Sequence, residues 1–82
     1  MTVRARIRQF IVDSFFVDEF SDEESFLRNS IIDSLGMLEL VAFLEKQFGI
    51  KIEDAELVPE NLDSLARVCL FVERKRSVGT AA

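Results

Sequence analysis

Three segments of the chain repeat apolar residues at the spacing of an amphipathic helix. A chain of 82 residues with this pattern can adopt few folds. The segments span about residues 3–16, 34–48 and 63–76. Residues 50–52 alternate apolar and charged side chains as a short strand does, but no other segment offers a partner strand. We therefore expect an all-α domain in which 50–52 is an extended linker with its two isoleucines buried.

Capping residues mark the ends of the predicted helices. Thr2, Asp33 and Asp63 stand where an N-cap side chain would accept a backbone N–H of the first turn. Gly49 stands at the usual C-terminal stop position of the second helix. A shorter helical turn is expected over residues 54–58.

The connections between the helices are long for so small a domain. Residues 16–33 lose the helical period, and we expect Phe16, Phe20 and Phe26 to fold back onto the core from this loop, with a helical turn near 25–28. Loops of this length are often functional. A turn is expected at 59–61, where Pro59 moves the preceding residue, Val58, out of helical geometry.

The length is that of one domain, which we place at residues 1–76, with 77–82 as a disordered C-terminal tail. No run of about 18 apolar residues is present, so no membrane insertion is expected. The one cysteine, Cys69, has no internal disulfide partner and lies in an apolar stretch that predicts burial. The lack of a disulfide framework favours a reducing, cytoplasmic location. With no histidine and one cysteine, a zinc site of the usual histidine and cysteine type is excluded, and no metal is expected.

Charge is distributed unevenly along the chain. The net charge is −5, but residues 13–63 hold fourteen acidic and three basic side chains, a net −11. An acidic surface repels nucleic acid and anionic lipid and attracts basic protein surfaces. It is also compatible with a simple solubilising role.

The tripeptide Asp-Ser-Leu occurs twice, at 33–35 and 63–65. Only the first copy is followed by an acid on the same helix, Glu39, five residues after Ser34. No histidine or second base stands nearby to activate this serine as a nucleophile. The pattern therefore indicates a serine that is modified by another enzyme, whereas the second copy is explained as an ordinary helix start.

The stretches Ile31-Ile32-Asp33-Ser34-Leu35-Gly36-Met37-Leu38-Glu39-Leu40 and Leu44-Glu45-Lys46-Gln47-Phe48-Gly49-Ile50-Lys51-Ile52 resemble the acyl carrier protein family. The resemblance extends to helix order, length and the long first loop. It implies an acyl-carrier-protein-like four-helix bundle with three main helices and one short helix. It also implies a carrier that is not an enzyme and that tethers acyl or aminoacyl intermediates as thioesters for fatty-acid, polyketide or nonribosomal peptide biosynthesis.

The resemblance assigns roles to particular residues. Ser34 would bear the 4'-phosphopantetheine arm derived from coenzyme A, and Asp33 and Leu35 would be read by the phosphopantetheinyl transferase. Further partners would be an acyl or aminoacyl loading ligase and synthase or transferase enzymes with basic docking patches, acting on a monomeric carrier. The partner surface would comprise Met37, Leu38, Glu39, Glu45, Glu53, Asp54 and Glu56. The cargo and the pathway stay open.

One departure from the family pattern lies before the motif, where members often have glycine and this chain has Asn29-Ser30. Asparagine tolerates left-handed geometry, so we expect the turn to survive.

Two other functions are compatible with a small helical domain. One is an acidic protein–protein adaptor without a prosthetic group. The other is a helix-turn-helix DNA-binding protein, which the acidic second helix disfavours.

Overall fold

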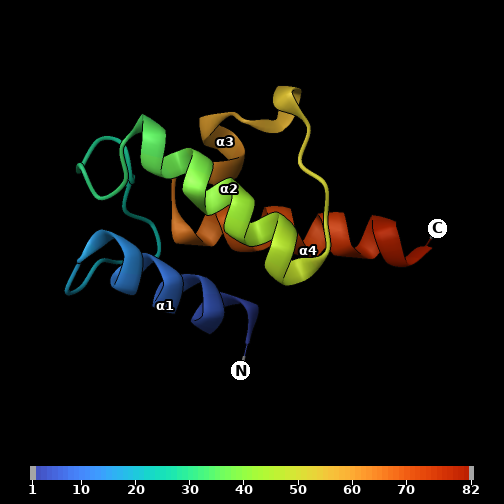
Figure 1. Cartoon of the computed structure of the whole chain (residues 1–82), viewed down its shortest axis with the longest axis horizontal. Helices are drawn as coiled ribbons and strands as arrows, with labels where there is room; N and C mark the ends of the chain where they lie inside the picture. The colour runs from blue at the N-terminus through green and yellow to red at the C-terminus, as the bar shows by residue number, and fades with distance from the viewer. Residues whose placement is uncertain (1, 82) are drawn as a thin grey trace.

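The structure, a computed structural model, describes the backbone of residues 2–81 and the side chains of residues 2–76. Within this range all the regular secondary structure is helical, with no strand, which confirms the predicted fold class. Two long helices, α1 and α2, run in opposite directions, and α4 lies behind them (Figure 1). The elements are α1 (Val3–Phe15), α2 (Ser34–Phe48), the 3-10 turn η1 (Asp54–Glu56), α3 (Pro59–Leu62) and α4 (Leu65–Ala81).

The core forms where the apolar stripes of α1, α2 and α4 meet. Each stripe places side chains three or four residues apart on one helix face, as the sequence pattern predicts. Phe20, Phe26 and Ile32 of the first connection complete the core. The fully buried side chains are Ile7, Ile11, Phe26, Ile32, Leu40, Leu44, Leu65, Val68 and Val72.

The predicted caps of the first two main helices are confirmed. Thr2 accepts a hydrogen bond from the backbone N–H of Ala5, with 3.0 Å between the heavy atoms. Asp33 caps α2, and Gly49 ends it in left-handed geometry at φ 63°. Capping satisfies N–H groups that have no partner inside the helix.

The predicted cap of the last helix is wrong by one residue. The Ser64 hydroxyl, not Asp63, accepts the hydrogen bond from the Arg67 N–H at 3.2 Å. The Asp63 carboxylate instead accepts from the Ser25 hydroxyl at 2.5 Å and from the Leu27 N–H at 3.0 Å. Asp63 thereby ties the long loop to the start of α4.

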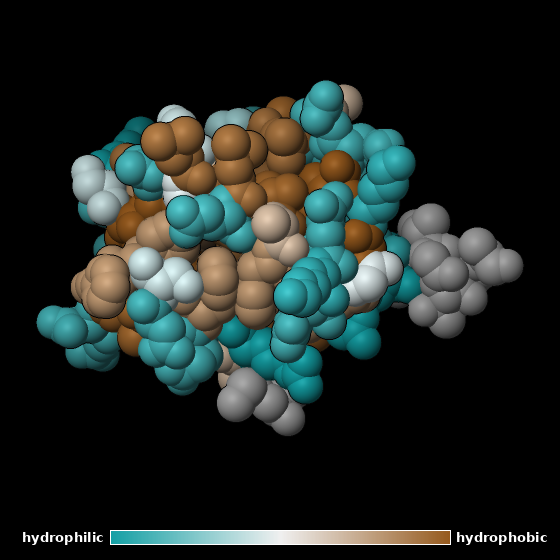
Figure 2. Space-filling model, in the orientation of Figure 1, coloured by the Kyte–Doolittle hydropathy of each residue, from teal (hydrophilic) through white to brown (hydrophobic). Residues whose placement is uncertain are grey.

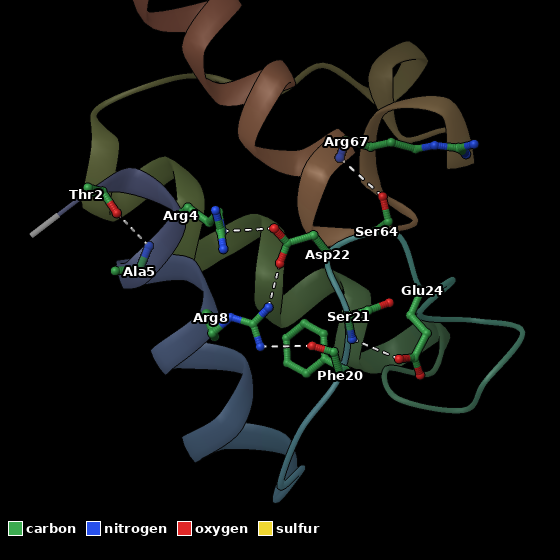
Figure 3. A network of polar contacts seen from close by, with 10 residues as sticks. All are labelled: Thr2, Arg4, Ala5, Arg8, Phe20, Ser21, Asp22, Glu24, Ser64 and Arg67. Carbon is green, nitrogen blue, oxygen red and sulfur yellow. Dashed lines mark hydrogen bonds and ion pairs between the residues drawn. The ribbon is translucent and has the colours of Figure 1, made fainter.

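A second attachment holds the beginning of the long loop (Figure 3). The Arg8 guanidinium donates to the Phe20 carbonyl at 3.0 Å and to the Asp22 carboxylate at 2.6 Å. Arg4 pairs with the same carboxylate at 3.0 Å. The Asp22 carbonyl accepts from the Ala66 N–H at 2.9 Å. These contacts join α1 to the loop at Phe20 and Asp22, and Asp22 also joins the loop to α4.

The three loop phenylalanines differ in where they lie. Phe20 and Phe26 are buried as expected, but Phe16 is 92% exposed, so its predicted burial is wrong. Phe16 is the C-cap residue of α1 and has a left-handed backbone, at φ 55°. This conformation turns the chain at the helix end and leaves the ring outside the core.

The region before α4 contains more helix than predicted. Residues 54–56 form the expected turn as η1, but the turn predicted at 59–61 is the one-turn helix α3. Proline has a backbone angle suited to the first helical position, and Val58 is extended, at ψ 154°, as its position before proline requires. The disordered tail predicted for 77–82 falls where side chains lie outside the described residues, so it stays a prediction.

Candidate functional site

Ser34 is the first residue of α2, and its side chain is exposed. Asp33 holds this helix start in two ways. Its carboxylate Oδ1 accepts from the Gly36 N–H at 2.7 Å, and its carbonyl accepts from the Met37 N–H at 2.9 Å. The first turn of a helix leaves further N–H groups without intrahelical partners, here those of Ser34 and Leu35. Such groups favour an anion such as a phosphate.

Gly36 allows α1 to approach the start of α2 closely. A Cβ atom at this position would lie 2.6 Å from Cε1 of Phe15 and 3.0 Å from Cγ2 of Ile32. It would also lie 3.1 Å from the capping oxygen of Asp33. The absence of a side chain therefore lets the end of α1 support the turn that presents Ser34.

Backbone hydrogen bonds hold the residues that precede Asp33. The N–H groups of Ile31 and Ile32 both donate to the Phe26 carbonyl, at 2.9 and 3.2 Å. Left-handed geometry is present in this turn as expected, but Ser30 adopts it, at φ 57°, and not Asn29. The turn survives without glycine because these hydrogen bonds and the buried Ile32 hold it.

An apolar pocket of about 90 Å³ opens between the first turns of α2 and the region of α3. Met37 lines it from α2, one turn after Ser34, and Leu27 and Leu57 line it from the connections. Sequence reasoning placed Met37 at the site but missed both leucines, since neither belongs to a periodic segment. The complete lining is Leu27, Met37, Leu57, Val58, Pro59, Leu62 and Asp63.

The residues predicted as a partner surface separate into two groups. Leu38, Glu39 and Asp54 are exposed. Glu45 is half-buried, and its carboxylate accepts from the Ile52 N–H at 2.8 Å, fixing the linker after α2. The hydrogen bond thus gives Glu45 a structural role.

Glu56 also has internal partners. Its carboxylate accepts from the Glu53 N–H at 2.9 Å and pairs with Lys75 Nζ of α4 at 2.9 Å. The Glu53 N–H first, and Lys75 second, lower the pKa of the Glu56 carboxyl below its ordinary value. Glu56 therefore fastens η1 to α4, while Asp54 beside it stays exposed.

The two Asp-Ser-Leu copies have different surroundings. Ser64 is only 3% exposed and its hydroxyl caps α4. Ser34 is exposed at the end of its helix. Of the two copies, only the first therefore has its serine exposed to solvent.

Other reactive or binding groups are scarce in the described part of the chain. Cys69 is half-buried, and burial, with Glu73 next in importance, raises the pKa of its thiol. A raised pKa lowers the thiolate fraction and hence reactivity. No group of three or more potential metal ligands lies together among residues 2–76. None of the described helices is long and apolar enough to cross a membrane.

Comparisons with known proteins agree with this geometry. Residues 5–72 match the family model described as phosphopantetheine attachment site. The acyl carrier protein of Solidesulfovibrio magneticus is 31% identical over 80 residues, which cover 93% of this chain and 97% of that protein. The acyl carrier protein of Akkermansia muciniphila is 32% identical over 75 residues, with 89% and 91% covered.

A further relative is the polyketide-8 synthase acyl carrier protein 2 of Streptomyces avermitilis, 32% identical over 56 residues that cover 66% of this chain and 64% of that protein. These matches favour a carrier over an adaptor without a prosthetic group. The chain therefore belongs to the acyl carrier protein family, as a carrier with a covalently attached 4'-phosphopantetheine group.

Proposed function

We propose that Ser34 is the attachment residue and that Asp33 and Leu35 are read by the transferase that modifies it. The observation that carries this assignment is the contrast between the two Asp-Ser-Leu copies, exposed at Ser34 and buried at Ser64. The hydroxyl of Ser34 is free to approach another protein, whereas that of Ser64 is occupied in capping α4.

The environment of Ser34 suits a phosphodiester. The attachment forms a bond between Ser34 Oγ and the β-phosphorus of coenzyme A, and the bond from that phosphorus to the adenosine bisphosphate portion breaks. The serine proton passes to a base of the transferase, since no histidine is present in this chain. The orphan N–H groups of Ser34 and Leu35 then favour the negative phosphate. When bound, the group supplies a thiol on a flexible arm, which carries an acyl or aminoacyl group as a thioester.

The chain would act only as a carrier, without catalysis of its own. We propose a monomer in the cytoplasm, served by a phosphopantetheinyl transferase and a loading ligase. It would present its cargo to synthase or transferase enzymes with basic docking patches. Glu39 and Asp54 support this contact because both are exposed and neither carboxylate has a hydrogen bond or ion pair among residues 2–76.

Mass spectrometry tests the assignment. The protein is incubated with coenzyme A and a broad-specificity phosphopantetheinyl transferase, and is then weighed beside the variant Ser34→Ala. We expect one phosphopantetheine group on the unsubstituted chain and none on the variant. An adduct on Ser34→Ala, or none on either protein, would refute the assignment.

A further inference from the structure

The solvent-facing side of α2 beside Ser34 is apolar. Leu35 is 75% exposed and Leu38 is 57% exposed, and Ala42 continues the exposed stripe one turn further. Hydrophobic surface gathers over α2 and continues towards α1 (Figure 2). A helix that faces water is ordinarily polar on that side, and a contiguous exposed apolar patch marks an interaction surface.

The same helix offers little negative charge to a partner. Its two acids are Glu39 and Glu45, and the Glu45 carboxylate is bonded to the backbone of Ile52 at 2.8 Å. Lys46 adds a positive charge on the exposed side. Attraction of a basic patch to this side of α2 therefore rests on Glu39 and on the exposed cap residue Asp33, whose Oδ1 already accepts from the Gly36 N–H at 2.7 Å.

The position of Ser34 indicates which protein binds the exposed apolar side of α2. The transferase must bring a phosphorus atom within bonding distance of Ser34 Oγ, so it covers the adjoining residue Leu35. Leu38 lies three residues further along, and residues at this spacing are neighbours on a helix surface. An enzyme that reaches the serine across the exposed side of α2 therefore buries both leucines.

We propose that the phosphopantetheinyl transferase binds this carrier mainly through an apolar recess that receives Leu35 and Leu38, with Glu39 contributing orientation. The inference rests on the proposed attachment at Ser34 and adds the chemistry of the partner. Desolvation of exposed leucines is non-directional and is not screened by salt, whereas surface charge pairs weaken as salt screens them. A small number of buried apolar anchors commonly carries most of the affinity of an interface.

The test uses the full chain, coenzyme A and a broad-specificity phosphopantetheinyl transferase. The KM for the carrier is measured for the unsubstituted chain, Leu38→Gln and Glu39→Gln at about 50 mM and about 500 mM NaCl. Leu70→Gln is the matched control, because Leu70 is 62% exposed but lies on α4. Circular dichroism melting confirms that each variant is folded.

We expect Leu38→Gln to raise KM about tenfold with kcat within about twofold, and Glu39→Gln to raise it less than about threefold. Leu70→Gln should leave KM unchanged within about twofold, and salt should change the KM of the unsubstituted chain less than about threefold. A KM of Leu38→Gln within about twofold of the unsubstituted chain, or a tenfold rise with salt, overturns the apolar recess. If either of these KM results is found while the phosphopantetheine group is still attached, only the apolar recess is wrong and Ser34 stays the attachment residue. If no group is attached, both proposals are wrong.

Discussion

Replacing Asp63 with alanine should loosen the loop that leads into the attachment site. The substitution removes the acceptor of the part-buried hydrogen bond from the Ser25 hydroxyl at 2.5 Å and of the more exposed bond from the Leu27 N–H at 3.0 Å. A hydrogen bond to a charged group contributes about 1.5–3 kcal/mol when buried, and less where water replaces it. We therefore expect the two losses to lower the free energy of unfolding by about 2 kcal/mol.

Thermal and urea unfolding followed by circular dichroism measure this effect. For a domain of this length, about 2 kcal/mol corresponds to a fall in Tm of roughly 8–16 °C. Amide hydrogen exchange should also quicken at Phe26, whose N–H donates to the Asp63 carbonyl at 2.9 Å. The control is Glu60→Ala, an exposed carboxylate on α3. A loss below about 0.5 kcal/mol for Asp63→Ala, or an equal loss in the control, would show that the Asp63 carboxylate does not hold the loop.

Three further predictions concern the contacts that join the helices. Arg8→Met should lower the free energy of unfolding by about 1–2 kcal/mol, since it removes the bonds to the loop, while exposed Arg6→Met should change it by less than about 0.5 kcal/mol in the same melts. Lys75→Met should lower the free energy of unfolding, because it removes the ion pair with Glu56. This loss should have its full size above the ordinary Glu56 pKa of 4.5 and should disappear as the pH falls through the lowered pKa of the folded protein; a loss that persists in acid contradicts this. In the modified protein iodoacetamide should label the thiol of the arm faster than Cys69, and mass mapping that finds Cys69 labelled first would contradict the burial effect.

Features set by neighbouring residues were predictable from the sequence. The periods of α1 and α2, the caps Thr2 and Asp33 and the stop at Gly49 each depend on residues within one or two turns. Local propensity and side-chain capping act over that range. The candidate serine was found for the same reason, since its helix start is a local signal.

Features set by contacts distant along the chain were not predictable. The sequence around Asp63 predicts a helix cap, but in the fold its carboxylate accepts a hydrogen bond from Ser25, 38 residues earlier. Glu45 reads as an exposed acid, yet it bonds the backbone of Ile52 after the helix has ended. Phe16 reads as a core residue from its type alone, whereas the left-handed C-cap places it outside.

The central claim is that one serine, Ser34, carries the arm. Trypsin cleaves after lysine and arginine, so residues 29–46 and residues 52–67 form separate peptides, which contain the first and second Asp-Ser-Leu copies. Fragmentation spectra of the modified protein should place the phosphopantetheine group on Ser34 in the first peptide and leave the second unmodified. A phosphopantetheine group on Ser64, or on Ser30 within the first peptide, would show that Ser34 is not the attachment residue.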